Sequence, residues 1–236
     1  MKGKCYAIIL ASGEGKRFEG KLPKQFIWIK GKTVIEHTIK TFDDCPDVDE
    51  IILVVNPDYK YFVDKLLLNE KYSKLTKIIN GGKLRVESAY NGLKSAGGDD
   101  NDIVLIHDAV RPFVTLKCIQ DCIIRLNNVN SVGVAVPVTD TIYQFRDNNE
   151  VTMSVDRNKL LRAQTPQGFR IGLIRKAYEL AIKDKDIEFT DDVSIILHYN
   201  LDKVYWVPGD ESNIKITYPV DEEYAKLIMD TRELEK

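Results

Sequence analysis

The run Ile51-Ile52-Leu53-Val54-Val55 constrains the fold more than any other stretch of the 236-residue sequence. A strand with one face in water alternates apolar and polar side chains, whereas this run is apolar at every position, so both faces of the strand must be buried. Strands of this kind are typical of parallel sheets that helices cover on both sides. The sequence therefore predicts an α/β protein with a mostly parallel, Rossmann-like sheet.

Further strand-like runs alternate with helical patterns along the chain. The predicted strands are residues 6–11, 50–56, 75–80, 102–107 and 131–137. The predicted helices are residues 33–42, 60–69, 84–96, 116–127, 173–183, 191–198 and 222–232. This alternation gives right-handed crossovers and a three-layer sandwich, which binds ligands at the carboxyl ends of its strands. We expect residues 1–236 to form a single domain.

The alternation stops at residues 138–162. Residues 141–146 alternate with a period of two, a polar turn cluster follows, and residues 151–155 are expected to return as a second strand. This pattern predicts a projecting β-hairpin arm. Beyond it, we expect Thr-Pro-Gln-Gly at residues 165–168 to form a turn, and residues 213–217 to form a late strand on which Lys215 faces solvent.

A small glycine-containing loop follows the first predicted strand. Its sequence is Ala-Ser-Gly-Glu-Gly-Lys-Arg-Phe at residues 11–18, and Pro-Lys-Gln follows at 23–25. Glycines let backbone N–H groups approach an anion, and Lys16, Arg17 and Lys24 can neutralise phosphate oxygens. Arg17 stands where a Walker loop has Ser or Thr, and Phe18 stands where a dinucleotide fingerprint has its third glycine. The loop therefore predicts a nucleoside triphosphate site of neither kind.

Two more motifs follow strand ends, so we expect them to lie beside this loop. One is Gly81-Gly82, which suits close backbone approach to a base edge, with Ser88 either adding a hydrogen bond or lying exposed. The other is His107-Asp108, in which Asp108 is a candidate Mg²⁺ ligand and His107 is expected to be a packed structural residue. Arg111 either binds a second phosphate or pairs with Asp108 to fix the loop.

Two polar motifs remain, one with Arg157 and Thr165 and one at residues 190–192. Arg157 and Thr165 would form a phosphate clamp if the hairpin folded back over the strand ends. Residues 190–192, Thr-Asp-Asp, are typical of a helix N-cap.

The composition argues against a nucleic-acid-binding, membrane or secreted protein. The net charge of −2 provides no basic field for nucleic acid, and no apolar stretch of about 18 residues predicts a membrane span. The first residues lack the pattern of a signal peptide, so we expect a cytoplasmic protein. The four cysteines, Cys5, Cys45, Cys118 and Cys122, are expected to be buried free thiols, because no histidine near Cys118 and Cys122 completes a zinc site.

Taken in order, these motifs resemble the cytidylyltransferase family that makes 4-diphosphocytidyl-2-C-methyl-D-erythritol in the non-mevalonate isoprenoid pathway. The resemblance extends from Ile9 to about Ala225 and includes Asp-Thr at 140–141, Val-Asp-Arg at 155–157, Gln-Thr-Pro-Gln at 164–167 and Asn-Ile-Lys at 213–215. The chain departs from the family at Ser12, Lys83 and Val110, and the departure at Lys83 leaves its contact to the cytidine open.

The resemblance implies a role for each matching residue. The residues implied for CTP are Ala11, Ser12, Gly13, Gly15, Gly82 and Ser88, with the catalytic cations Arg17, Lys24 and Lys215 on the triphosphate. Asp108 would bind Mg²⁺. The residues implied for the methylerythritol phosphate are Arg111, Asp140, Thr141, Arg157, Thr165 and Thr190. The resemblance also implies a homodimer, in which the arm of residues 138–162 crosses a two-fold axis and Arg157 serves the neighbouring site.

Two alternatives remain open at this point. The motif at residues 107–116 is also similar to the sister branch that makes CDP-ribitol from ribitol 5-phosphate, although residues 155–158 and 161–167 favour the isoprenoid branch. A non-catalytic CTP sensor on the same scaffold would need the glycine loop but not the second set of phosphate-binding residues.

Overall fold

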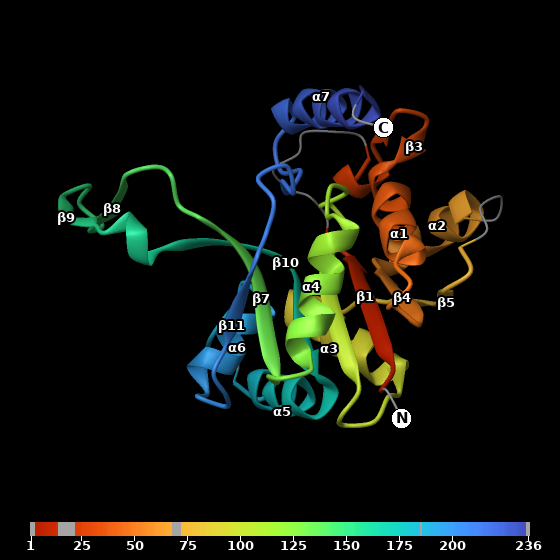
Figure 1. The fold of residues 1–236 in the computed structure, drawn as a ribbon, viewed down its shortest axis with the longest axis horizontal. Helices are drawn as coiled ribbons and strands as arrows, with labels where there is room; N and C mark the ends of the chain where they lie inside the picture. Colours follow the sequence, from red (N-terminus) through yellow and green to blue (C-terminus); the bar gives the residue numbers. More distant parts are fainter. Residues whose placement is uncertain (1–2, 14–21, 68–71, 185, 235–236) are drawn as a thin grey trace.

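A computed structural model of the protein describes residues 3–13, 22–67, 72–184 and 186–234. Within these residues, seven strands form one sheet in the order β11-β7-β10-β6-β1-β4-β5, and two hairpins stand apart from it. Figure 1 shows the sheet at the centre of the molecule with helices on both sides. The fold is therefore the expected three-layer α/β sandwich with a projecting hairpin.

The strands of the large sheet are β1 (Cys5–Ala11), β4 (Glu50–Val55), β5 (Leu75–Asn80), β6 (Ile103–Asp108), β7 (Ser131–Pro137), β10 (Leu161–Arg170) and β11 (Tyr205–Pro208). The hairpins are β2 (Trp28–Ile29) with β3 (Lys32–Thr33), and β8 (Ile142–Phe145) with β9 (Val151–Val155). The helices are α1 (Val34–Asp44), α2 (Lys60–Leu67), α3 (Arg85–Ala96), α4 (Leu116–Leu126), α5 (Ile171–Ala181), α6 (Asp192–His198) and α7 (Val220–Leu234), with short 3-10 helices at Lys24–Phe26, Pro57–Tyr59 and Arg157–Lys159. Each predicted strand of the sheet and each predicted helix is confirmed, apart from residues 68 and 69, which lie outside the described residues.

The two faces of the sheet make two separate cores. Strand β1 pairs in parallel with β4 and β6, so that Ile8 lies opposite Ile52 and Ile106. Ile8 and its neighbours on that face pack on α3, α5 and α6, whereas Ile9 on the other face packs on α1, α2 and α4. Residues 51–55 are fully buried, as their uniform apolarity predicts. All four cysteines are thiols outside any disulfide and lie in the core on the α1, α2 and α4 side.

The prediction of a turn at residues 165–168 is wrong, because these residues belong to β10. This strand lies between β6 and β7 and is antiparallel to both, with Gln167 opposite Ile106 on one side and Gly133 on the other. The sequence hides the strand because a register shift between Ala163 and Gln167 interrupts the ladder, and because Pro166 has no N–H to donate.

The C-terminal part of the chain differs from expectation at two places. Edge strand β11, which is parallel to β7, was not predicted. The segment of residues 213–217 is not a strand. It runs beside the β6–α4 connection instead, and the Ile216 N–H donates to the carbonyl oxygen of Val110. Helix α7 then packs on β2–β3 and on this connection in a third, smaller core.

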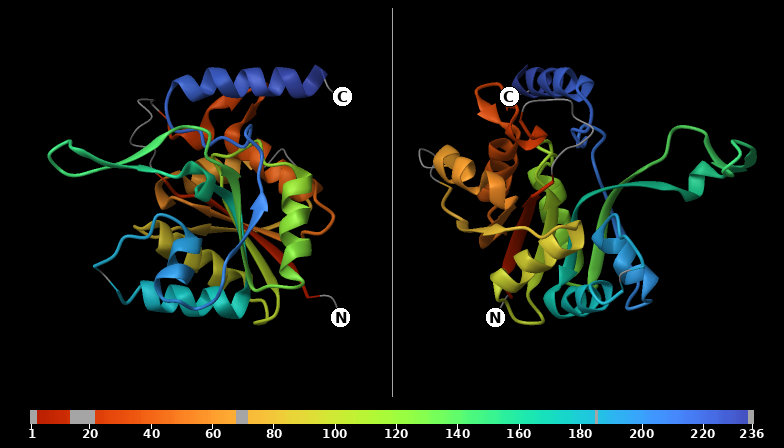
Figure 2. Two further views of the ribbon diagram at one scale, coloured as in Figure 1. Left: turned by 60° about the vertical axis from the view of Figure 1, so that its left-hand side comes forward. Right: turned by 180° about the vertical axis from the view of Figure 1, so that it is seen from behind.

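The predicted hairpin arm is confirmed as β8–β9, with Ile142 opposite Val155. Figures 1 and 2 show it extending away from the body of the molecule, from the ends of β7 and β10. Its apolar side chains are exposed: Ile142, Tyr143, Phe145, Val151 and Met153. A two-stranded hairpin with apolar side chains in water is at best marginally stable, so this surface is suited to being covered by another chain.

Gly92 of α3 provides a test of the packing between helix and sheet. A Cβ atom there would lie 2.5 Å from Cγ2 of Ile8 and 3.1 Å from Cγ2 of Val54. In an exposed helix, Gly→Ala stabilises by about 1 kcal/mol, but here we expect Gly92→Ala to lower the free energy of unfolding by about 1–3 kcal/mol through overpacking. Urea denaturation measures the change, with Lys94→Ala on the exposed side of α3 as the control. A stabilised Gly92→Ala protein would contradict this packing.

Candidate functional site

A cavity of about 860 Å³ lies at the carboxyl ends of β1, β5 and β6. The three motifs that follow these strands meet in its lining, as the sequence predicts. The lining includes Ala11, Ser12, Gly13, Lys24, Gly81, Gly82, Lys83, Arg85, Ser88, Asp108 and Lys215. Gly15, Lys16 and Arg17 lie outside the described residues.

The side chain of Gln25 braces the described part of the glycine loop. It is almost fully buried, and its Nε2 donates to the carbonyl oxygens of Ala11 and Gly13, at 2.9 and 3.0 Å. Lys24 precedes Gln25 in the same short helix and lines the cavity. The amide therefore fixes the helix that carries Lys24 relative to the loop.

Ser88 joins the glycine loop to the Gly81-Gly82 turn. Its hydroxyl accepts from the Ser12 hydroxyl at 2.9 Å and from the Gly82 N–H at 3.1 Å, and the side chain is buried rather than exposed. A Cβ at Gly81 would lie 2.6 Å from the Cβ of Ser12, so the two loops approach too closely for any larger residue. Lys83 is exposed, and its backbone N–H donates to Glu87 Oε2 at 2.7 Å.

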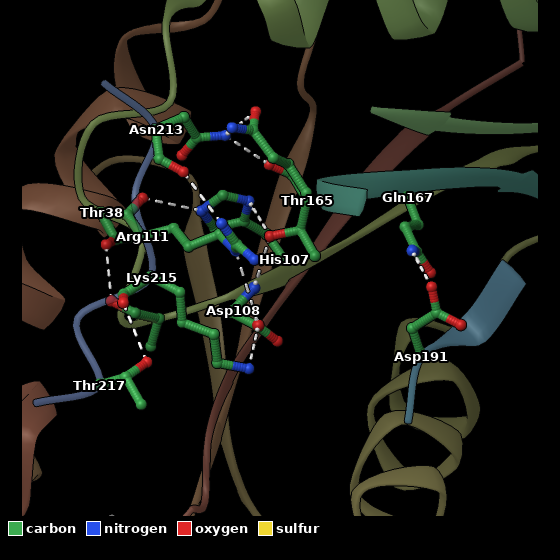
Figure 3. Close-up of polar contacts among 12 residues, drawn as sticks. Thr38, His107, Asp108, Arg111, Thr165, Gln167, Asp191, Asn213, Lys215 and Thr217 are labelled. Atoms are coloured by element: carbon green, nitrogen blue, oxygen red, sulfur yellow. Dashed lines mark hydrogen bonds and ion pairs between the residues drawn. The ribbon is translucent and has the colours of Figure 1, made fainter. Parts of the chain in front are cut away.

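Asp108 is a carboxylate in the cavity wall that three cations surround. Lys215 Nζ lies 2.8 Å from its Oδ2, Arg85 Nη2 lies 3.6 Å from its Oδ1, and Arg111 Nε lies 3.8 Å from its Oδ2. Burial alone would raise the pKa of Asp108, but the positive charges of Arg85, Lys215 and Arg111 outweigh burial and hold the pKa well below its usual range. Figure 3 shows Lys215 reaching this carboxylate, so the expectation that Lys215 only faces solvent is wrong.

Arg85 is a site residue that the sequence analysis missed. Its guanidinium makes two hydrogen bonds to Asp192, at 2.9 and 2.8 Å, and Asp192 also accepts from the Tyr178 hydroxyl at 2.7 Å. Burial lowers the pKa of Arg85, but the carboxylates of Asp192 and Asp108 outweigh it and raise that pKa far above its usual value. The available signal was a cation in the first turn of a helix, where the helix dipole disfavours it unless an anion lies near.

A second cavity, of about 380 Å³, adjoins the first. Its polar lining residues are Arg111, Arg162, Gln164, Glu211, Asn213, Lys215, Thr217, Tyr218 and Asp221. Lys215 lines both cavities. Arg111 lines only the second cavity and donates to the carbonyl oxygen of Asn213 at 2.9 Å, which ties the 213–217 segment to the turn that follows Asp108.

Thr165 and Thr190 of the predicted acceptor site lie outside both cavity linings. Thr165 is buried, and its hydroxyl accepts from the Asp108 N–H at 3.1 Å and lies 2.9 Å from His107 Nδ1. Thr190 is exposed and precedes Asp191, whose side chain accepts from the Ser194 N–H and forms the N-cap of α6. His107 is fully buried, and burial lowers its pKa to about 4, in accord with the prediction of a structural residue.

The three predicted residues of the arm lie away from both cavities of their own chain. Asp140, Thr141 and Arg157 are exposed, and Arg157 Nη1 donates to the carbonyl oxygen of Thr139. The arm extends outward from the body of the molecule (Figure 1), and Arg157 lines neither cavity of its own chain.

The Arg85–Asp192 ion pair provides a test of the cavity wall. We expect Arg85→Met to lower the free energy of unfolding by about 3–5 kcal/mol, because Asp192 keeps a buried charge that has lost its partner. The double variant Arg85→Met/Asp192→Asn is expected to be more stable than Arg85→Met, since an amide carries no charge. Urea denaturation of Arg85→Met, Asp192→Asn and the double variant measures the coupling between the two side chains, and additive losses of stability would contradict the ion pair.

The comparisons with known proteins agree with this geometry. The sequence profile of the 2-C-methyl-D-erythritol 4-phosphate cytidylyltransferase family matches residues 5–231. A protein of that name from Thermobifida fusca is 39% identical over 95% of this chain and 93% of its own length, and one from Clostridium perfringens is 42% identical over 93% and 96%.

Solved structures show the same relationship. The 4-diphosphocytidyl-2C-methyl-D-erythritol synthase of Anaerococcus prevotii superposes with a TM-score of 0.84 at 30% identity, covering 97% of this chain and 96% of the other. The 2-C-methyl-D-erythritol 4-phosphate cytidylyltransferase of Francisella tularensis superposes with a TM-score of 0.79 at 30% identity, covering 95% and 99%. A family profile that covers nearly the whole chain, relatives matched over more than nine-tenths of their length and a common fold lead to one conclusion: the chain belongs to the 2-C-methyl-D-erythritol 4-phosphate cytidylyltransferase family.

Proposed function

We propose that the protein joins CTP to 2-C-methyl-D-erythritol 4-phosphate, giving 4-diphosphocytidyl-2-C-methyl-D-erythritol and pyrophosphate. The observation that carries this proposal is a pair of adjoining cavities that share Lys215, with the Lys215–Asp108 ion pair in the wall of the larger one. A transferase needs such a junction, because the acceptor phosphate must meet the α-phosphorus of the nucleotide. Family membership supports the identity of the two substrates.

In this proposal CTP occupies the larger cavity. The backbone of Ala11, Ser12, Gly13 and Gly82 approaches the nucleoside, with Ser88 holding the two loops together. Lys24 and Lys215 hold the triphosphate, together with Arg17, and Gly15 belongs to the same phosphate loop.

The chemistry is a direct in-line displacement. An oxygen of the acceptor phosphate forms a bond to the α-phosphorus of CTP, the bond from that phosphorus to the bridging oxygen breaks, and pyrophosphate leaves with the electron pair. A phosphate dianion is already a nucleophile at neutral pH, so no Ser or Cys nucleophile and no general base is required. Catalysis then comes from positioning and from cations that stabilise charge on the α-phosphate and the leaving group.

Asp108 fits a role as Mg²⁺ ligand. It is an ionised carboxylate that lines the nucleotide cavity, and Mg²⁺ takes one or two carboxylates together with substrate phosphates and water. Among the described residues no group of three or more His, Cys, Asp or Glu side chains converges as a metal site, which suits an ion held mainly by the nucleotide. When bound, Mg²⁺ would neutralise phosphate charge there.

The acceptor site involves residues of two chains. From one chain, Arg111 at the second cavity would hold the methylerythritol phosphate. Thr165 would contribute by fixing the turn that carries Arg111, and Thr190 would belong to the same acceptor site. Asp140, Thr141 and Arg157 would come from the arm of a second copy. The exposed apolar surface of β8–β9 supports a homodimer formed through this arm. No helix among residues 3–13, 22–67, 72–184 and 186–234 is long and apolar enough to cross a membrane. We propose a cytoplasmic location because the relatives are biosynthetic enzymes.

The test of the function is pyrophosphate release by the purified protein with Mg²⁺ and CTP. We expect release with 2-C-methyl-D-erythritol 4-phosphate and not with ribitol 5-phosphate. Lys24→Ala is expected to lower kcat by about 100- to 1,000-fold, as removal of one transition-state donor does. Preference for ribitol 5-phosphate would move the protein to the sister branch, and a Lys24→Ala protein with near-normal turnover would exclude Lys24 from catalysis.

The arm is tested by mixing two inactive variants. In a dimer of Lys24→Ala with Arg157→Ala, one site has both an intact Lys24 and an intact Arg157 only if the arm serves the neighbouring chain. With half of the dimers mixed and one intact site in each, we expect about a quarter of wild-type activity. If Arg157 served its own chain, the mixture would stay as inactive as the parents. Phe145→Glu/Met153→Glu is expected to give a monomer in light scattering.

A further inference from the structure

His107 contacts the turn that follows β6, strand β10 and helix α1, and it lines neither cavity. Its ring is fully buried and packs beside Phe42, with ring centroids 5.0 Å apart. Nε2 lies 3.0 Å from the carbonyl oxygen of Arg111, and Nδ1 lies 2.9 Å from the Thr165 hydroxyl. Figure 3 shows the ring between Arg111 and Thr165, with Asp108 adjacent.

The chemistry of the partners fixes the direction of each hydrogen bond. A carbonyl oxygen only accepts, so Nε2 must donate its proton to Arg111. The Thr165 oxygen accepts from the Asp108 N–H at 3.1 Å, and its own proton then points to Nδ1. Both ring nitrogens thus face neutral partners, which suits a neutral imidazole with one proton. The bonds run from the Asp108 N–H to Thr165, from Thr165 to Nδ1, and from Nε2–H to Arg111.

The backbone explains why a side chain is needed here. The ladder between β6 and β10 ends where Ile106 lies opposite Gln167, so Asp108 has no strand partner on that side. Thr165 replaces that partner. The Arg111 N–H donates to the Asp108 carbonyl oxygen at 3.0 Å, which makes residues 108–111 a tight turn, and the ring of His107 closes that turn onto β10.

We propose that His107 is a positioning residue that, as the neutral tautomer with its proton on Nε2, fixes the Asp108–Arg111 turn against Thr165. It sets the distance between the Asp108 carboxylate, at the nucleotide cavity, and the Arg111 guanidinium, at the second cavity. The inference goes beyond the family resemblance in one respect: the Thr165 proton is committed to His107, so Thr165 acts on the acceptor through the turn and does not donate to its phosphate.

The tautomer is measured directly on the wild-type protein. The chain has only three histidines, His37, His107 and His198, so ¹⁵N-labelled imidazoles give few signals and His107→Gln assigns them. At neutral pH we expect the Nε2 of His107 to be protonated and its Nδ1 to show the shift of an unprotonated acceptor. A proton on Nδ1 would overturn the inference, whether or not any variant folds.

The kinetic consequence rests on the proposed function and is tested with two complementary variants. His107→Asn keeps an acceptor near the Nδ1 position, and His107→Gln keeps a donor near the Nε2 position, so each keeps one of the two bonds. We expect kcat to fall about 10- to 100-fold, as loss of outer-shell partners does, with a higher KM for 2-C-methyl-D-erythritol 4-phosphate and an unchanged KM for CTP.

The matched control is His37→Gln, since the Nε2 of His37 also contacts a carbonyl oxygen, that of Ile29 at 2.7 Å, outside both cavities. Wild-type kinetics in both His107 variants would overturn the inference, as would equal rises in the KM of both substrates. If no acceptor supports pyrophosphate release by wild-type protein, the proposed function fails, and the tautomer still decides the role of His107.

Discussion

The site depends on one buried carboxylate that must stay charged. Asp108 ends β6, and the three cations around it come from segments far apart in the chain: Arg85 from the start of α3, Arg111 from the turn after β6, and Lys215 from the segment before α7. The Asp108 carboxylate and the largely buried guanidinium groups of Arg85 and Arg111 would each be costly to bury alone, so each segment stabilises the position of the others. The arrangement of the two cavities follows from this mutual dependence.

Arg85 also links this charged cluster to the core that α3, α5 and α6 form with the sheet. Arg85 binds Asp192 as well as Asp108, and Asp192 begins α6 and accepts from Tyr178 of α5. Gln167 of β10 caps the same helix, because its Oε1 accepts from the N–H groups of Asp192 and Val193. The carboxyl ends of the strands are thus held by polar contacts that are themselves buried, and Figure 3 shows Gln167 and Asp191 on the side of the site away from Lys215.

Much of this architecture could be predicted from local patterns. Residues 51–55 required a doubly covered strand, and glycines after strands indicated the cavity. The missed features depend on partners distant in sequence. Strand β10 buries Gln164, Thr165 and Gln167, which local polarity assigns to a turn, because their hydrogen-bond partners lie on other segments. Arg85 and the contact of Lys215 were hidden for the same reason, since their carboxylates are 107 residues away.

The placement of the four cysteines has a practical consequence. All of them lie on the same side of the sheet, under α1, α2 and α4, and each is buried. Burial raises the pKa of the Cys45 thiol, and the Cys118 contact with burial raises that of Cys122, so little thiolate is available to react. A thiol-reactive reagent therefore labels the chain only when this helical layer separates from the sheet. The layer of α1, α2 and α4 therefore carries its own chemical reporter of local opening, with no engineered probe.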